Sequence, residues 1–275
     1  MLLRLAKLHG LGNDFLVLVD GSSVPEDHRA ELARRVCDRH RGIGADGLLF
    51  VLPVHNDAEA EADVRMRLHN ADGSIAEMSG NGIRCFAQAI TIAGVVSTGT
   101  VRVQTDAGVR VIEVSDTDPC TGIATVSVDM GELAFDSHPV HGADGHTVDV
   151  GNPHLVIPVD SLDNLDITVT GPEREAPYLN GPTRGINVHV VKAADNRTID
   201  MVVWERGVGV TQACGTGATA VAGVMHRIGL TGSHVTVRQP GGNATVDIAD
   251  GRATLHGPSQ FIADAEFAFA AQGTR

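Results

Sequence analysis

Short hydrophobic runs, rich in β-branched residues, recur along the chain and are bounded by Gly, Asp and Asn. Such runs are typical of strands, because β-branched side chains pack well on a pleated sheet and the bounding residues favour turns. The pattern predicts a strand-rich chain, with strands for example at residues 101–103, 110–114, 124–128 and 198–204. Helices are expected to be fewer.

Three segments have helical spacing, and they differ in polarity. Residues 26–40 are mostly polar, with Leu32, Ala33 and Val36 on one apolar face. Residues 83–93 and 218–228 are apolar on most sides, and a helix that is hydrophobic nearly all round must be buried. We therefore expect a mixed α/β fold of the α+β kind, in which a mostly antiparallel sheet wraps around a central buried helix.

Four sequence features occur twice in the same order, which indicates duplication and fusion of one ancestral half. The pairs are residues 12–15 with 151–154, 41–44 with 184–187, 79–82 with 214–217, and 101–111 with 235–246. Two pseudo-symmetric domains follow from this pattern. We assign residues 1–120, with the final strand at 264–275, to the first half and residues 121–263 to the second, and we expect the active site in the cleft between them. Residues 116–119 read as the linker.

Composition narrows the classes of function. The net charge is −13, which argues against nucleic acid or an anionic membrane as a partner. No apolar run approaches the length of about 20 residues that a membrane span needs, and residues 1–7 are too short and polar for a signal peptide. The four cysteines lack disulfide or zinc spacing: Cys37, Cys85, Cys120 and Cys214. We expect a reduced, cytoplasmic protein without a metal.

The closest repeated pair places a small nucleophilic residue before G-x-G, at the start of each apolar helix. These residues are Ser79 and Cys214. A helix start offers free backbone N–H groups and the positive end of the dipole, so it binds a carboxylate well. The same position is expected to lower the pKa of the Cys214 thiol and make it a usable base. The plain alternative is a buried cysteine beside a tight glycine turn.

Two such helix starts suit the inversion of a stereocentre, which needs a base on one face of the carbon and an acid on the other. A carboxylate held there also has its developing enolate charge stabilised. Pyridoxal enzymes use a lysine Schiff base for this task. The only lysines are Lys7 and Lys192, one at the N-terminus and neither in a recognisable context, so the pyridoxal route is not expected.

Several motifs together resemble diaminopimelate epimerase over about residues 5 to 260. They are residues 7–15, 42–47, 70–74, 151–154, 185–188, 204–209 and 213–217. The resemblance implies the two-domain fold of that family, no cofactor or metal, and conversion of L,L-diaminopimelate to the meso isomer for lysine and cell-wall synthesis. It also implies a small amino-acid substrate and makes a homodimer plausible.

The resemblance also assigns the site residues. Cys214 and Ser79 occupy the catalytic positions, with Glu205 and with His154, which orients a catalytic group. The carried-over contacts to the substrate are Asn13, Asn70, Asn152, Asn187, Glu205 and Arg206, with carboxylate-cradling amides at Gly80, Asn81, Gly215 and Thr216. An arginine fork suits a carboxylate. Each asparagine could equally be a turn residue, Asn70 especially, and His154 could equally be a buried, hydrogen-bonded histidine.

The chain departs from the family at one position. The family has its first catalytic cysteine directly before Gly80, where this chain has Ser79. A hydroxyl is a far weaker acid than a thiol, so the equal exchange of roles between two thiols is broken. Cys85 lies six residues further on and is interpreted as a core residue. Three explanations stay open. Ser79 still delivers a proton; the substrate or the reaction has changed, to that of a related epimerase or of a one-base exchange or elimination enzyme on another amino acid; or the chain is a disabled Cys→Ser variant.

Two other classes of function compete. A thiol hydrolase or transferase would use Cys214 as nucleophile, His154 as base and Glu205 as orienter. That function would predict a covalent acyl intermediate and would leave the duplication without a purpose. An epimerase that has lost its activity and serves as an amino-acid sensor would bind diaminopimelate without exchanging its α-proton.

Overall fold

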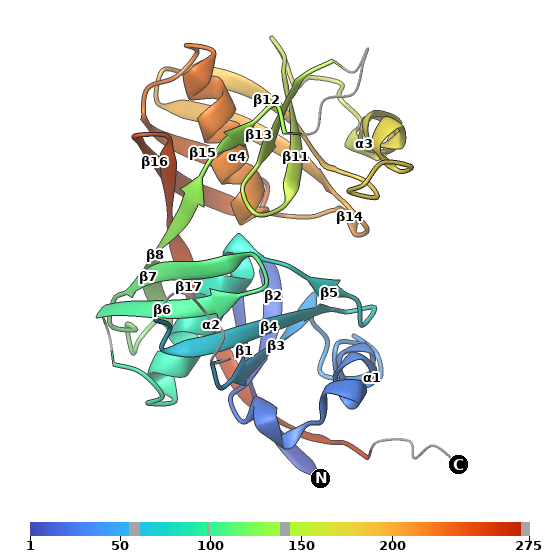
Figure 1. Cartoon of the computed structure of the whole chain (residues 1–275), viewed down its shortest axis with the longest axis vertical. Coiled ribbons are helices and arrows are strands. Elements are labelled where there is room, and N and C mark those ends of the chain that lie inside the picture. The colour runs from blue at the N-terminus through green and yellow to red at the C-terminus, as the bar shows by residue number, and fades with distance from the viewer. Residues whose placement is uncertain (55–60, 98, 138–143, 271–275) are drawn as a thin grey trace. The chain divides into compact units, whose positions relative to one another are not determined.

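The computed structural model describes residues 1–54, 61–97, 99–137 and 144–270. The chain forms two units, Met1–Val128 with Pro258–Arg275 and Asp129–Gly257 (Figure 1). It passes between them inside two strands, β8 (Ile123–Glu132) and β17 (Arg252–Ala268). The boundary expected at residues 120 and 121 stays a prediction.

The first unit surrounds one of the apolar helices with strands. Its other strands are β1 (Leu2–Gly10), β2 (Asn13–Leu18), β3 (Gly47–Leu52), β4 (Val64–Asn70), β5 (Ile75–Ala76), β6 (Gly99–Thr105) and β7 (Gly108–Val114), and its helices are α1 (Glu26–Val36), α2 (Gly80–Ile92) and the 3-10 helix η1 (Gly21–Ser23). The later part of β17 pairs with β1, from Gln260 opposite His9 to Ala268 opposite Leu2. The last strand therefore ends on the first unit.

The second unit uses the same kinds of element. Its strands are β9 (Ala134–Phe135), β10 (His146–Asp149), β11 (Pro153–Pro158), β12 (Asn187–Asp195), β13 (Thr198–Glu205), β14 (Gly209–Val210), β15 (His234–Gln239) and β16 (Gly242–Ala249), and its helices are α3 (Ile167–Glu175), the 3-10 helix η2 (Ala176–Tyr178) and α4 (Gly215–Arg227). The earlier part of β17 pairs with β16.

The two units have the same strand pairing, which confirms the duplication. In the first, β2 and β3 are parallel, β3 and β4 antiparallel, β4 and β6 parallel, and β6 and β7 antiparallel. In the second, β11, β12, β13, β15 and β16 repeat this sequence of directions. The α+β class and the mostly antiparallel sheets are as predicted.

Each sheet wraps around its apolar helix. α2 contacts β1, β2, β3, β4 and β7, and α4 contacts β10, β11, β12, β13, β15 and β16. Residues 80–90 of α2 and 215–225 of α4 are all buried, which confirms that helices without a polar face lie inside. The buried Cys85 is a core residue of α2, as predicted. No helix in the described part of the chain is long and apolar enough to span a bilayer.

Both helices begin three residues earlier than their apolar patterns suggest, at Gly80 and Gly215. The reason is a side-chain cap. Ser79 Oγ accepts a hydrogen bond from the amide of Gly82 at 3.0 Å, and Cys214 Sγ accepts one from the amide of Gly217 at 3.3 Å. Such caps satisfy an N–H that has no partner inside the helix. The two nucleophilic residues of the sequence pattern are therefore the N-caps of the two buried helices.

The helix expected over residues 26–40 is shorter, and this prediction was wrong at its C-terminal end. α1 ends at Val36, whose carbonyl accepts from the amides of Ile43 and Gly44. Asp38 folds the following residues into a turn, because its carboxylate accepts from the amides of His40 and Arg41 at 2.8 and 2.9 Å. Such a local side-chain bond competes with the helix and ends it.

A stability prediction arises from the packing under the first turn of α4. A side-chain carbon at Gly217 would lie 2.3 Å from Cε1 of the completely buried His189 ring. We expect Gly217→Ala to lower the free energy of unfolding by about 1–3 kcal/mol, because the rigid ring cannot yield without a shift of its neighbours. Chemical denaturation with a circular-dichroism signal measures the change.

Gly223→Ala, in the same helix, is the matched control. Its new carbon would lie 2.6 Å from Cδ1 of Leu133, the end of a flexible side chain that can rotate away. Both substitutions replace a helical glycine of α4 by alanine, which by itself favours the helix by up to about 1 kcal/mol. Equal stability of the two variants would contradict the close packing of Gly217 on His189.

Candidate active site

Cys214 is surrounded by polar partners from α4, β15 and the end of β13. The residue is 4% exposed, and its Sγ lies 3.5 Å from Thr216 Oγ1. Its backbone amide donates to Gln239 Oε1 at 2.7 Å, which fixes the chain where α4 begins. Glu205 makes a side-chain hydrogen bond with the thiol and accepts another from Thr211 Oγ1 at 2.5 Å.

The expected lowering of the Cys214 pKa was wrong. Burial raises the pKa of the thiol well above its usual value, and the negative charge of Glu205 raises it further. The hydrogen bonds from Thr216 and Gly217 lower it, but by less. Desolvation of the thiolate therefore outweighs the favourable helix start. Cys214 is therefore a neutral thiol at pH 7, with the Glu205 carboxylate beside it.

The predicted contact residues of the second unit gather at one end of its sheet. Asn152 directly precedes β11, Asn187 begins β12, and Glu205 and Arg206 lie at the end of β13. This clustering follows from topology, because β11 and β12 are parallel and the antiparallel β13 ends where they begin. Asn152 Nδ2 donates to Thr216 Oγ1 at 3.5 Å, which links the cluster to the start of α4.

Asn187 and Arg206 also make hydrogen bonds to the protein backbone. The Asn187 Nδ2 donates to the carbonyl of Pro153 at 2.9 Å, and its Oδ1 accepts from the amide of Arg206 at 3.0 Å. The guanidinium of Arg206 donates to the carbonyl of Thr183 at 2.8 Å. Asn187 therefore ties the ends of three strands to one another.

His154 is completely buried, and both of its ring nitrogens have partners. Nε2 lies 2.8 Å from Asn152 Oδ1, and Nδ1 lies 2.8 Å from His189 Nε2. Burial lowers its pKa well below the usual value. These bonds give it an orienting contact with Asn152. Both ring nitrogens are thus occupied by other partners. The thiol-hydrolase alternative would instead require His154 to act as the base for Cys214.

The first unit repeats this arrangement with different side chains. Ser79 is half-buried and caps α2 as Cys214 caps α4. Asn81 Nδ2 donates to Asn13 Oδ1 at 3.2 Å, and Asn13 Nδ2 donates to Asp46 Oδ2 at 2.7 Å. Asn13 begins β2 at the same place where Asn152 precedes β11. The structure therefore brings Ser79, Gly80, Asn81 and Asn13 together.

Asn70 has the turn contacts that its sequence context suggested. It ends β4 opposite Gly47, and its Nδ2 donates to Ser74 Oγ at 3.0 Å. Its backbone amide also donates to the carbonyl of Ser74 at 2.8 Å. The next amide, of Ala71, donates to the carbonyl of Asp46 at 3.0 Å, so Asn70 lies near the Asn13 cluster.

Arg84 is a site neighbour that the sequence reasoning missed. It is completely buried and donates to the carbonyl of Gly80 at 2.8 Å and to Asn81 Oδ1 at 2.7 Å. Burial lowers its pKa to about 10, so the guanidinium is charged at pH 7. A positive charge under the first turn of α2 adds to the attraction of that helix start for an anion. Its position four residues after Gly80 was the available signal, because such residues share a helix face.

A polar network supports the Asn13 side, and it was also missed. Arg39 donates to Asp14 Oδ1 at 2.7 Å and to Asp46 Oδ1 at 2.8 Å, and Lys7 donates to Asp14 and to the carbonyl of Gly44. Burial raises the pKa of Asp14, but the hydrogen bonds from Arg39 and Lys7 outweigh it and lower the pKa to about 2. Lys7 is thus engaged in an ion pair. In the described ranges no cluster of His, Cys, Asp or Glu is arranged to hold a metal ion.

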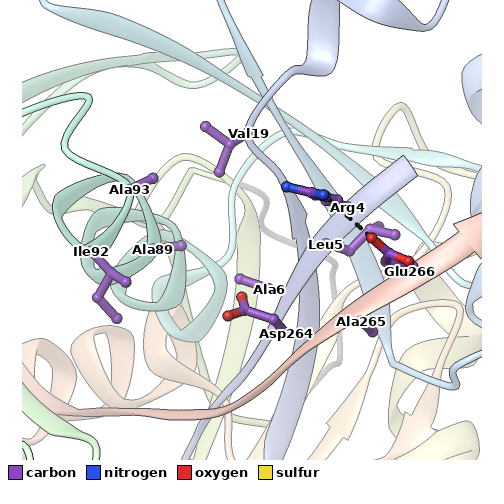
Figure 2. Close-up of a pocket in the computed structure, with 10 residues that line it drawn as sticks. All are labelled: Arg4, Leu5, Ala6, Val19, Ala89, Ile92, Ala93, Asp264, Ala265 and Glu266. Atoms are coloured by element: carbon purple, nitrogen blue, oxygen red, sulfur yellow. Dashed lines mark hydrogen bonds and ion pairs between the residues drawn. The ribbon is translucent and has the colours of Figure 1, made fainter. Parts of the chain in front are cut away.

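A separate cavity of about 520 Å³ lies at the other end of α2 (Figure 2). It is lined by Ala89 and Ile92 of α2, by the following Ala93, by Val19, and by residues of β1 and β17. Arg4 pairs with Glu266 there at 3.2 Å. None of the predicted site residues lines it. It is therefore distinct from the helix starts.

Comparisons with known proteins agree with the sequence pattern. The family model described as diaminopimelate epimerase matches residues 5–135 and 146–262. The chain is 40% identical to a diaminopimelate epimerase of Methanothermobacter thermautotrophicus over 88% of its length and 89% of the relative's. It is also 40% identical to one from Rhodococcus jostii, over 94% of both chains.

Solved structures share the fold at lower identity. A phenazine biosynthesis protein of the PhzF family from Bacillus anthracis matches with a TM-score of 0.73 at 15% identity, over 98% of this chain and 100% of that one. A hydroxyproline epimerase from Agrobacterium vitis matches with a TM-score of 0.68 at 17% identity, over 96% of this chain and 92% of that one. At these identities the likeness establishes the two-domain fold alone.

Proposed function

Because the chain belongs to the diaminopimelate epimerase family, a family of isomerases, we propose that it converts L,L-diaminopimelate to the meso isomer. The reaction removes the proton of one α-carbon and returns a proton on the opposite face. The protein uses no cofactor in this proposal, acts in the cytoplasm on a small amino acid, and forms a homodimer. The meso product serves lysine and cell-wall synthesis.

The observation that carries the proposal is the repeated helix start. Cys214 Sγ caps α4 and Ser79 Oγ caps α2, each through the amide of the third helix residue. The amides of Gly215 and Thr216 precede the capped one and are suited to cradle a carboxylate, as are those of Gly80 and Asn81 in α2. Donors aimed at a carboxylate stabilise the enolate that forms when the α-proton leaves.

Cys214 exchanges the proton with the α-carbon, and Glu205 assists it. Since burial and Glu205 keep the free thiol neutral, the thiol must first pass its proton to a neighbouring base. Glu205, hydrogen-bonded to the thiol, is suited to accept it. His154 acts through Asn152 and is a positioning residue in this scheme.

Ser79 is assigned to the opposite face of the same carbon. Its hydroxyl donates a proton to the enolate and is then reprotonated by water. Because a hydroxyl is a weak acid, inversion is slow in one or both directions. The alternative is a one-base reaction, in which Cys214 exchanges the α-proton or eliminates a β-group without inversion, or a disabled Cys→Ser variant. Because a hydroxyl is a far weaker acid than a thiol, this alternative stays open.

The distal end of the substrate carries an ammonium and a carboxylate, and the remaining residues suit these groups. The Arg206 guanidinium can bind a carboxylate in a forked geometry. Asn70, Asn152 and Asn187 supply neutral donors and acceptors. This set favours diaminopimelate over an amino acid with an apolar side chain.

Separation of the stereoisomers tests the proposal. L,L-Diaminopimelate is incubated with the protein, derivatised with a chiral reagent and resolved by chromatography over time. We expect the meso isomer to form, and the reaction started from meso to yield L,L. If the starting isomer persists while an activated ester gives a burst of product, the thiol-hydrolase function replaces this one. Tight binding of diaminopimelate by calorimetry without turnover would instead indicate a sensor.

A further inference from the structure

Two buried histidines form a hydrogen-bonded pair under the start of α4. His154 and His189 are both completely buried, with ring centroids 5.0 Å apart and planes tilted by 33°. Nδ1 of His154 lies 2.8 Å from Nε2 of His189. On its other side, Nε2 of His154 lies 2.8 Å from Asn152 Oδ1. The pair therefore ends on an asparagine at the candidate active site.

The orientation of the Asn152 amide sets the direction of the hydrogen bonds between Asn152, His154 and His189. Asn152 Nδ2 donates to Thr216 Oγ1, so its Oδ1 faces His154 and can only accept. His154 must then carry its proton on Nε2, which leaves Nδ1 as an acceptor. His189 must donate from Nε2. Its own Nδ1 is then unprotonated, and this buried atom has no hydrogen-bond partner within the described residues.

Burial keeps both rings neutral. It lowers the pKa of His189 to about 3 and that of His154 well below its usual value. Each ring therefore has one donor and one acceptor nitrogen at physiological pH. With the Asn152 amide in this orientation, one direction satisfies every contact, and the reversed direction would oppose two acceptors at Asn152 Oδ1.

The duplicated fold provides an internal comparison. His154 lies opposite Asn187 and Val156 opposite His189 in the β11–β12 pair, as Phe15 lies opposite Gly47 and Val17 opposite Leu49 in the β2–β3 pair. The first unit thus has buried Phe15 and Leu49 where the second has the two histidines. The fold does not need polar groups at these positions. A buried polar pair with an unpartnered atom costs stability, so its presence in the second unit alone points to the site above it.

Gly217 makes room for this pair. Its missing side chain allows the His189 ring to approach the first turn of α4, where a side-chain carbon would lie 2.3 Å from the ring. In the first unit, a carbon at Gly82 would meet Phe15 at 3.3 Å. The glycine that follows Thr216 therefore serves the histidine pair as well as the helix start.

We propose that His189 is a positioning residue for the epimerase reaction. Its donated hydrogen bond holds His154 in the Nε2–H tautomer, which in turn holds the amide of Asn152 with Nδ2 toward Thr216 and the bound substrate. Asn152 then presents a donor, suited to an oxygen of the substrate carboxylate and not to its ammonium group. This role rests on the proposed function, whereas the tautomer of His154 is a property of the free protein.

The test uses His189→Leu, which removes the donor, and His189→Gln, whose side-chain amide can restore it. ¹⁵N NMR of the labelled free protein reports the tautomer of His154. We expect Nε2–H alone in the parent and in His189→Gln, and a mixture of both tautomers in His189→Leu. Steady-state kinetics should give a KM for diaminopimelate raised about tenfold in His189→Leu, the effect of one lost hydrogen bond, with recovery in His189→Gln.

His226→Leu is the control for loss of a histidine from the same unit. His226 lies in the last turn of α4 and contacts the carbonyl of Thr231 at 3.3 Å, so its loss should lower the Tm without changing His154 or KM. A single Nε2–H tautomer and an unchanged KM in His189→Leu would overturn the proposal, as would Nδ1–H in the parent. If the parent shows no epimerase activity, the NMR result still decides the role of His189, and only the proposed function fails.

Discussion

Replacing Cys214 with alanine is expected to lower the rate of α-proton exchange in diaminopimelate by about 10³-fold, within the range that a positioned acid–base group contributes. The thiol caps the start of α4, is 4% exposed and is hydrogen-bonded to Glu205, so it is the group assigned to exchange the proton with the α-carbon. The variant keeps the helix but loses the cap on Gly217. Deuterium uptake at the α-carbon, followed by mass spectrometry, measures the loss.

Cys120→Ala is the matched control, because Cys120 is an exposed free cysteine. It should exchange the α-proton at the parent rate. A Cys214→Ala protein that retains more than about a tenth of the parent rate would show that another group removes the proton. Glu205 would then be the first candidate, since it lies beside the thiol.

Replacing Ser79 with cysteine is expected to raise the rate of inversion by about 10²-fold or more. The hydroxyl already occupies the cap position on α2 that the thiol occupies on α4, with 3.0 Å to the Gly82 amide. A thiol has a pKa of about 8.5 in the absence of perturbation, so it donates and accepts a proton far more readily than an alcohol. The ratio of meso formation to α-proton exchange separates inversion from one-sided exchange.

Ser79→Ala controls for the loss of the hydroxyl itself. It should invert more slowly than the parent and lose about 1 kcal/mol of stability with the helix cap. If Ser79→Cys gained nothing over the parent while Ser79→Ala kept the parent's rate, position 79 would have no part in proton transfer. The one-base alternative would then account for this chain better.

The sequence alone predicted those features of the fold that local hydrophobic pattern and the duplication determine. The all-round apolar helices had to be buried, and the matching G-x-G segments had to begin them. Both α2 and α4 have these properties. The clustering of Asn152, Asn187 and Glu205 followed from the resemblance, and the parallel and antiparallel order of β11, β12 and β13 explains it.

The sequence failed where tertiary surroundings decide. A helix start lowers a thiol pKa, but only the folded chain reveals that burial and the Glu205 carboxylate outweigh it at Cys214. The end of α1 depended on a turn made by Asp38. Arg84 and His189 are ordinary residues in the sequence. Their importance comes from contacts with Asn81 and His154, which packing creates.

Proton NMR of L,L-diaminopimelate incubated with this protein in D₂O tests the central claim most directly. The proposed two-sided transfer predicts that the α-proton signal is lost while signals of the meso isomer appear, even if slowly. Loss of the signal without meso product would leave Cys214 as a lone base and contradict the role of Ser79. A fully retained α-proton signal would contradict the epimerase function itself.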